Sequence, residues 1–324
     1  MDGLRLHERP EPRPGPGELL LGLRATALNS RDLMIVEGRY DPRLRLPTVP
    51  GSDAVWTVLE CGPAVVGYAP GDRVITLFSP GWGGGPPTRA LVRDALGGWR
   101  SGVWSERYIA TPSEVVPAPA SLTDEQAATL PCAGLTAWSA LISLGGLCPG
   151  QTVVATGSGG VAIFAVQIAR QAGARVALVS GSPDKAARLT ELGAEAILDR
   201  RSPWAKAARQ WAGGEGVDHV LDLGGAGSIS QSIDAIRPGG VVSVIGVLGG
   251  AVEPIDVRPI LMKQARVQGV FVGDRTGLLA LCTAASAGIW RPAIHKRHGF
   301  EDIPAALADL ADGQHVGKIV VTAP

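Results

Sequence analysis

The 324-residue sequence lacks the features that mark membrane, secreted or nucleic-acid-binding proteins. Its four cysteines, Cys61, Cys132, Cys148 and Cys282, stand too far apart for a disulfide framework or a C-x-x-C metal motif. No apolar run approaches the roughly 20 residues of a membrane span, and the N-terminus has no apolar signal core. The formal net charge is zero, which does not indicate a nucleic-acid partner. We therefore expect a cytoplasmic protein with free thiols that binds neither membrane nor nucleic acid.

A glycine-rich turn between a strand pattern and a helix pattern is the most informative stretch. The β-branched run 152–155 predicts a buried strand, and an apolar helical pattern follows the glycines. Gly157 permits a tight turn, and Gly159 lets a pyrophosphate approach the backbone. The helix that starts at Gly160 and Val161 offers N–H groups and a partial positive charge to phosphates. This order of elements predicts a dinucleotide site.

The chain divides into a turn-rich β region and a region of alternating strands and helices. Residues 1–118 are rich in short strand patterns and turns, whereas 119–291 alternate in the manner of a parallel sheet covered on both faces. The tail 292–324, with a helix over 300–310 and a strand over 318–322, is expected to return to the first domain. The predicted parallel strands are 152–155, 175–179, 195–198, 219–222, 241–245 and 266–270, and the predicted helices are 160–172, 184–192, 203–211 and 228–236.

Two stretches of unusual composition lie outside this pattern. Residues 80–102 are rich in Gly, Pro, Trp and Arg, which predicts a long surface loop and a candidate lid. His295 and His298 flank two cations without acidic or cysteine partners in sequence, so we expect a solvated basic turn there, not a metal site.

The residues after the second parallel strand indicate which nucleotide binds. An NAD site usually has an acidic residue there, for the ribose 2′-hydroxyl, but this sequence has Ser180 and Ser182, followed by Lys185. Arg200 follows the third strand. A missing carboxylate and nearby cations favour a 2′-phosphate, so we predict NADPH as the cofactor. If Lys185 is an ordinary solvated residue, NADH remains possible.

The chain resembles the medium-chain dehydrogenase/reductase superfamily, in particular its zinc-free, quinone-oxidoreductase-like branch. The resemblance rests on motifs spread over nearly the whole chain, including 14–18, 27–32, 49–53, 71–74, 130–138, 222–225, 245–247 and 317–320. It implies a GroES-like catalytic domain (1–118 plus 292–324) and a doubly wound Rossmann domain (119–291), an α/β fold with the nicotinamide in the cleft between them. Members of this superfamily usually have an opening strand before the region that matches residues 2–5, and this sequence lacks it. We therefore expect either that the sequence starts late or that this edge of the first domain is reduced.

The same resemblance assigns further cofactor contacts and an assembly. Thr136 matches the family position near the nicotinamide, and Gly246, Val247 and Lys318 lie in family motifs at the cofactor. The strand 266–270 matches the family's homodimer seam, so we expect a homodimer, as an edge strand left bare would be a liability.

The expected zinc ligands are largely missing. Zinc-containing members of the superfamily use Cys, His and Cys, with a neighbouring Glu. By the resemblance, Asn29, Ser52 and Cys132 occupy the ligand positions and Asp53 the Glu position. Amide and hydroxyl groups are poor zinc ligands, so we predict no bound metal. A covalent role for Cys132 competes with its role as a small buried hydrophobe.

These residues together predict the chemistry. Without a Lewis acid, substrates that accept hydride readily are favoured, and we predict a zinc-independent NAD(P)H-dependent oxidoreductase that reduces quinones or α,β-unsaturated carbonyls, as small hydrophobic conjugated substrates. Asn29 could donate to a developing oxyanion, or it could be a turn residue bonded to its own backbone. Arg31, with Asp32, could shape the pocket, and Tyr40 could donate a proton or only pack. The alternatives are a metal-free alcohol or ketone dehydrogenase and a non-catalytic NADPH-binding redox sensor.

Overall fold

The structure is a computed structural model that describes residues 3–288 and 290–324, and these form two compact units. Unit 1 contains the chain up to Leu135 together with Gly273–Pro324, and unit 2 is Thr136–Val272. The sequence places the domain limits at 118/119 and 291/292, so the two divisions differ over the segments 119–135 and 273–291. The second segment forms a helix that contacts strand and helix residues of unit 1, which accounts for its grouping with that unit.

Unit 1 is built on a seven-stranded sheet in the order β12-β13-β1-β2-β3-β5, with β4 also paired to β1. All its pairs are antiparallel except β12 with β13. The strands are β1 (Leu19–Ala27), β2 (Asp53–Cys61), β3 (Arg73–Thr76), β4 (Arg107–Ala110), β5 (Val115–Pro117), β12 (Ile294–Gly299) and β13 (Lys318–Thr322). The helices are α1 (Ser30–Val36), α2 (Arg89–Arg93), α3 (Asp124–Ala127), α10 (Arg275–Ser286) and α11 (Ile303–Asp312), with a π-helical turn η2 (Leu130–Gly134).

The register of this sheet brings three chain segments to one place. Ala27, the last residue of β1, is opposite Asp53 at the start of β2 on one side and Val320 in the middle of β13, two residues after Lys318, on the other. The strand pairing therefore gathers Asn29, Asp53 and Lys318, which are far apart in sequence, at one end of the sheet.

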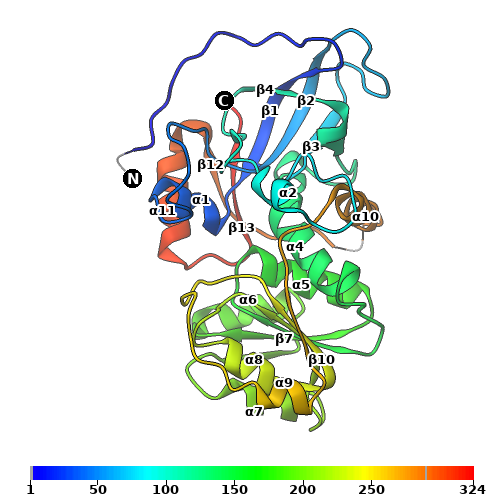
Figure 1. Cartoon of the computed structure of the whole chain (residues 1–324), viewed down its shortest axis with the longest axis vertical. Coiled ribbons are helices and arrows are strands. Elements are labelled where there is room, and N and C mark those ends of the chain that lie inside the picture. Colours follow the sequence, from blue (N-terminus) through cyan, green and yellow to red (C-terminus); the bar gives the residue numbers. More distant parts are fainter. Residues whose placement is uncertain (1–2, 289) are drawn as a thin grey trace. The chain divides into compact units, whose positions relative to one another are not determined.

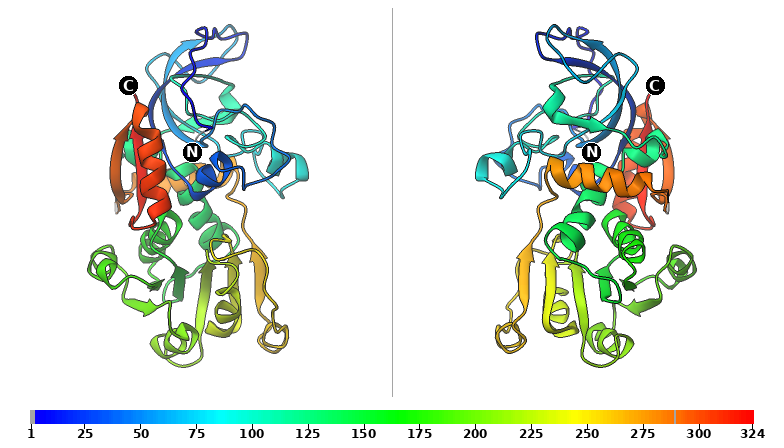
Figure 2. Two further views of the ribbon diagram at one scale, coloured as in Figure 1. Left: turned by 90° about the vertical axis from the view of Figure 1, so that its left-hand side faces the viewer. Right: turned by 90° about the vertical axis from the view of Figure 1, so that its right-hand side faces the viewer.

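Apolar side chains of the sheet and of α11 form the core of unit 1. Leu19, Leu21 and Trp56 from the strands pack with Ala306 and Leu307 of α11, and all are nearly inaccessible to solvent. Figure 2 shows α11, in red, lying against β12 and β13, in agreement with their contacts. This packing fixes β13, and with it the position of Lys318.

Unit 2 contains a six-stranded parallel sheet in the order β11-β10-β9-β6-β7-β8. Figure 1 shows helix α5 on one side of this sheet and α7 and α8 on the other, so its central strands are buried on both faces, as β6 is along its whole length. The strands are β6 (Thr152–Thr156), β7 (Arg175–Ser180), β8 (Ala196–Asp199), β9 (Val217–Asp222), β10 (Ile236–Val244) and β11 (Arg266–Gly269). The helices are α5 (Gly160–Gln171), α6 (Ala186–Glu191), α7 (Trp204–Trp211), α8 (Ile229–Ala235) and α9 (Arg258–Met262), and helical residues α4 (Leu135–Trp138) and η3 (Ser139–Ser143) precede β6. The predicted α/β class, with a β-rich domain and a doubly wound parallel sheet, is confirmed.

Two local predictions hold only in part. Residues 83–90 are exposed, as the predicted surface loop requires, but the stretch 80–102 also contains α2, and Leu96 is fully buried with its N–H bonded to Phe78 O (3.0 Å). The predicted basic turn at 295–298 is part of the edge strand β12: residues 295–297 are exposed, as predicted, but the His298 ring N–H donates to the Asp309 carboxylate (2.7 Å). In both stretches the exposure suggested by polar composition is present in part, and long-range contacts add structure that composition does not indicate. None of the helices among residues 3–288 and 290–324 combines the length and apolarity needed to span a bilayer.

Glycines allow the segment after α2 to lie directly on the turn before β2. Gly51 has a positive φ (+84°), and a Cβ there would collide with the indole of Trp104. Side chains at Gly97 or Gly102 would collide with the backbone of Gly51. This close approach holds Ser52 and Asp53 in place.

We expect Gly51→Ala to destabilise the protein by roughly 3 kcal/mol, because the new Cβ adds a clash to a strained positive φ. The matched control is Gly67→Ala, with a similar φ (+87°) and no atom near the new Cβ, which should cost about 1 kcal/mol. Denaturant unfolding of both variants measures the difference. Equal costs would mean that the contact with Trp104 imposes no constraint.

Candidate functional site

The predicted site residues fall into two groups, one on each unit, and each group is described by itself. Asn29, Arg31, Tyr40 and Lys318 belong to unit 1, and the glycine-rich turn with its neighbours belongs to unit 2.

The unit 1 group is centred on the buried ammonium of Lys318. Lys318 is 3% exposed, and its Nζ donates to the Oδ1 of Asn29 (2.6 Å) and to the backbone oxygen of Leu28. The carboxylate of Asp53 lies 4.0 Å from the same nitrogen. A buried cation is stable only when it is compensated in this way, so the lysine joins the ends of β1, β2 and β13.

The Asp53 carboxylate accepts two hydrogen bonds in addition to its contact with the lysine. Ser52 Oγ donates to its Oδ1 (2.8 Å), and the backbone N–H of Cys132 donates to its Oδ2 (3.2 Å). Burial raises the pKa of this carboxyl, and the charge of Lys318, the amide of Asn29 and the two hydrogen bonds counteract the rise. The lysine, the Asn29 amide and the two hydrogen bonds therefore offset part of the cost of burying this carboxylate.

Asn29 is fixed at both its backbone and its side chain. It caps the N-terminus of α1, and its backbone N–H donates to Asp32 Oδ2 (2.8 Å). Its Oδ1 accepts from Lys318, whereas its Nδ2 is buried and makes no regular hydrogen bond with another described residue. Asp32 is fully buried, which raises its pKa to about 6 although Arg31 counteracts the shift. The Asn29 amide is thus an oriented, partly unsatisfied donor.

Arg31 lies between two aromatic rings. Its guanidinium carbon is 5.0 Å from the ring centre of Tyr40 and 4.7 Å from that of Phe78, and its Nη1 donates to Leu96 O (2.7 Å). Its Nη1 is 4.0 Å from Asp32 Oδ1, at the limit of an ion pair. The predicted association of Arg31 with Asp32 is therefore present at the limit of an ion pair, and the guanidinium also makes cation–π contacts with Tyr40 and Phe78.

Cys132 is a thiol and not a thiolate. Burial, and then the nearby Asp53 carboxylate, raise its pKa far above that of an exposed cysteine. A neutral thiol is a weak nucleophile and a weak metal donor. Within residues 3–288 and 290–324, no cluster of three or more His, Cys, Asp or Glu side chains could hold a metal ion.

The unit 2 group begins at the turn between β6 and α5. Gly157 has a φ of +100°, which favours glycine, and its N–H donates to Val179 O (2.8 Å) at the end of β7. Gly159 is the N-cap residue of α5, a helix of 12 residues, and Gly160 and Val161 form its first turn. The N–H groups of a first turn have no partner within the helix, so this turn has the donors that a phosphate requires.

Cations surround the ends of β7 and β8. Lys185 Nζ donates to Ser158 Oγ in the glycine turn (3.2 Å), and the Arg200 backbone N–H donates to Ser180 O (3.1 Å). A Cβ on Gly181 would lie 3.1 Å from the Arg200 guanidinium, so that guanidinium covers the glycine. Arg201, by contrast, pairs with Asp199 (3.0 Å).

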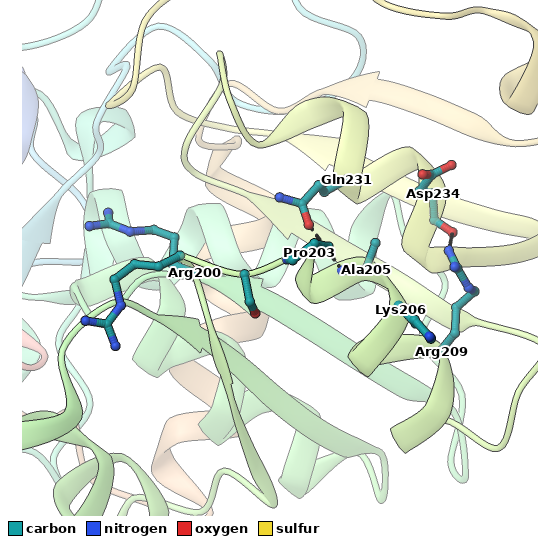
Figure 3. A pocket seen from close by; sticks show the side chains of 9 residues that line it. Arg200, Pro203, Ala205, Lys206, Arg209, Gln231 and Asp234 are labelled. Carbon is teal, nitrogen blue, oxygen red and sulfur yellow. Dashed lines mark hydrogen bonds between the residues drawn. The ribbon is translucent and has the colours of Figure 1, made fainter.

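A shallow basin of about 390 Å³ lies beside Arg200, between α7 and α8 (Figure 3). Its charged lining consists of Arg200, Arg201, Lys206 and Arg209, with Asp234 the acidic member. The surface next to the β7 and β8 ends is therefore positive, which favours anionic ligands.

The remaining predicted residues lie elsewhere in unit 2. Thr136 is nearly buried in α4, and Gly246 and Val247 follow β10, where Gly246 N donates to Asp222 O (3.2 Å). Sequence reasoning did not assign a role to Asp222, which is fully buried and accepts from Gly224 N and Gly225 N (both 2.9 Å). The sequence does contain a signal for this role, because Asp222 ends a predicted strand and is followed closely by Gly224 and Gly225.

Family models match both regions of the chain. Residues 15–120 match the alcohol dehydrogenase GroES-like domain, and residues 160–284 match the zinc-binding dehydrogenase domain. A zinc-type alcohol dehydrogenase-like protein of Schizosaccharomyces pombe is 34% identical over 94% of this chain and 91% of its own length. An acryloyl-coenzyme A reductase of Metallosphaera sedula is 30% identical over 99% of this chain and 96% of its own.

Solved structures agree with these sequence matches. A protein of Sinorhizobium meliloti 1021, named as an alcohol dehydrogenase, superposes with a TM-score of 0.93 at 40% identity and covers 98% of this chain and 94% of that one. A mycobacterial protein solved in complex with NADPH has a TM-score of 0.80 at 28% identity, with 98% and 95% of the two chains covered. The chain therefore belongs to the medium-chain dehydrogenase/reductase superfamily.

Proposed function

We propose that the protein is a zinc-independent, NADPH-dependent reductase of quinones or α,β-unsaturated carbonyl compounds. The observation that carries this proposal is the bond from Lys318 Nζ to Asn29 Oδ1 (2.6 Å). It occupies the oxygen of the first candidate metal ligand with a cation and leaves the amide N–H groups as the donors at that position. A site of this kind suits a substrate whose negative charge is already spread over a conjugated system.

The residues that would bind zinc fit the metal poorly. Asn29 Oδ1 accepts from an ammonium and Ser52 Oγ donates to Asp53, so only Cys132 among the three positions has a side chain of a preferred zinc-ligand type. Zinc prefers thiolate and imidazole ligands, and a dication beside Lys318 would meet electrostatic repulsion. We therefore derive no step through a metal, although the matching family model is named for zinc binding.

The cofactor proposal rests on unit 2. The N-terminus of α5 would receive the pyrophosphate, and Lys185, Arg200, Ser180 and Ser182 would surround a ribose 2′-phosphate. A relative binds NADPH, and the absence of an acid at 180–182 removes the group that would repel that phosphate. Bound NADPH would supply the hydride.

The chain's own residues would bind and polarise the substrate. The Nδ2 of Asn29 would donate to the substrate oxygen as negative charge develops there, which is how preorganised donors lower a barrier. Arg31, held by Tyr40 and Phe78, would shape the neighbouring surface. A relative named as an acryloyl-coenzyme A reductase acts on a conjugated double bond, and this supports the substrate class.

A metal-free alcohol or ketone dehydrogenase is the second candidate. Two relatives favour this candidate, because one is named a zinc-type alcohol dehydrogenase-like protein and the other an alcohol dehydrogenase. The same Asn29 donor would then have to stabilise a localised alkoxide, which is a harder task without a Lewis acid.

A homodimer is proposed from the edge of the unit 2 sheet. β11 is an edge strand that pairs with β10 alone in the described part of the chain, and Val267 on it is 40% exposed. Further exposed apolar side chains gather in the preceding segment: Leu248, Val252, Val257, Leu261 and Met262. Bare strand edges with apolar neighbours favour pairing with a second copy.

Purified protein should oxidise NADPH with 1,4-benzoquinone and with a simple enone, equally well with and without a chelator. Asn29→Ala should lower kcat about a hundredfold, because an oxyanion donor is lost. Gln314→Ala, which removes an exposed amide of unit 1, serves as the matched control and should retain activity. Loss of wild-type turnover upon chelation would contradict zinc independence, and turnover only with alcohols or simple ketones would favour the second candidate.

Lys185→Met should weaken NADPH binding roughly ten- to a hundredfold while NADH binding is unchanged, because a charge-assisted bond to phosphate is removed. Fluorescence titration with both nucleotides measures the ratio. Arg201→Met is the control, since Asp199 already pairs with this guanidinium. Equal losses for the two nucleotides would show that Lys185 does not read the 2′-phosphate.

Light scattering should give twice the mass of the 33.4 kDa chain, and Val267→Lys should shift the protein to monomer, because charge on an edge strand opposes pairing. Val66→Lys, at an 83% exposed valine of unit 1, should leave the mass unchanged. A monomeric wild type at high concentration would remove the dimer proposal.

A further inference from the structure

Lys318 has little hydrogen-bonding capacity left for a substrate. An ammonium carries three N–H donors, and those of Lys318 meet Leu28 O, Asn29 Oδ1 and the negative field of Asp53 at 4.0 Å. The side chain is 4% exposed. Any effect of this lysine on a reaction must therefore pass through the groups that it holds.

The lysine determines which way the Asn29 amide faces. An ammonium donates hydrogen bonds and accepts none, so Asn29 must turn its oxygen toward Lys318 and its Nδ2 away. The reverse orientation would place two donor groups against each other. The Asn29 backbone cannot compensate by shifting, because its N–H is bonded to Asp32 in the first turn of α1.

In this orientation the Nδ2 group of Asn29 has an N–H donor that is available to a substrate. Nδ2 carries two N–H groups and makes no regular hydrogen bond with the described residues. Burial raises the pKa of the Asp53 carboxyl, and the Asn29 amide is among the groups that counteract the rise. An N–H of Nδ2 is the donor that the proposed reductase requires for a carbonyl or quinone oxygen.

We propose that Lys318 is the positioning residue of the site: it fixes the Asn29 amide with Oδ1 toward the ammonium and Nδ2 turned away from it, and its buried charge lies beside residues that match the family's zinc-ligand positions by resemblance. The proposal rests on the proposed function for the identity of the reaction and differs from the sequence-based expectation that Lys318 binds the cofactor. The lysine transfers no proton, and the chemistry remains with Asn29.

The kinetic test uses a double-mutant cycle with Asn29. Lys318→Met should lower kcat ten- to a hundredfold, with NADPH affinity unchanged, because the amide is released. In an Asn29→Ala background the same substitution should cost little more, since both act through one interaction. Lys296→Met, at a half-exposed lysine of unit 1, is the control and should behave as wild type. Full additivity of the two losses would overturn the proposal.

A companion variant guards against misfolding. Removing Lys318 alone leaves Asp53 as an uncompensated buried charge. Lys318→Met combined with Asp53→Asn removes both charges: the oxygen of the new amide can still accept from the Cys132 N–H, and its NH₂ can donate to the Ser52 hydroxyl, which can act as an acceptor. This variant should fold and should show the same kcat loss as Lys318→Met. A folded double variant with wild-type kcat would overturn the proposal.

A spectroscopic test needs no turnover, because Asn29 is the only asparagine in the chain. Labelling with ¹⁵N-asparagine gives a single side-chain amide signal, which should be protected from exchange in the wild type. It should shift and lose protection in Lys318→Met but not in Lys296→Met. A moved signal supports the positioning role even if no acceptor oxidises NADPH, an outcome that would count against the proposed function alone. An unmoved signal with weakened NADPH binding would overturn the proposal and return Lys318 to the cofactor.

Discussion

The compensation of buried charge at the end of the unit 1 sheet is the constraint on which the candidate site depends. Asp32 and Asp53 are fully buried, and Lys318 and the guanidinium of Arg31 are nearly so. Removing one partner from such a cluster typically costs about 3–5 kcal/mol. The four formal charges sum to zero, so the register that brings β1, β2 and β13 together is also the register that balances them. Geometry and electrostatics therefore specify the same alignment of strand ends.

Much of unit 2 could be predicted because its signals are local. Each strand of a doubly wound sheet is a short apolar run, and each helix follows it within a few residues, so periodicity and glycine punctuation suffice. The turn around Gly157 follows the same logic, since its positive φ and the helix that starts at Gly160 are properties of adjacent residues. The helix over 275–286 was not predicted, because it follows the last parallel strand and no further strand comes after it to continue the alternation of strands and helices.

Unit 1 could be predicted less completely, since its sheet is formed by distant segments. Asn29 and Lys318 were each identified, but for separate roles, and the hydrogen bond between them joins residues 289 positions apart. No local pattern reports such a contact; it follows from the register of β1 with β13. The burial of Leu96 has the same origin, because Gly97 and Gly102 permit a close approach to Gly51 that composition alone does not reveal.

The choice of lysine at position 318 has a physical reason. The chain has 25 arginines and 5 lysines, so a cation placed without special demands would usually be arginine. Arginine suits a position where its planar guanidinium can stack on aromatic rings, as Arg31 does between Tyr40 and Phe78. At 318 the acceptors are a backbone oxygen and an amide oxygen from two consecutive residues, Leu28 and Asn29. A compact group with three donors on a flexible stem reaches both of these acceptors. The composition of the chain thus supports a specific requirement for an ammonium at this position.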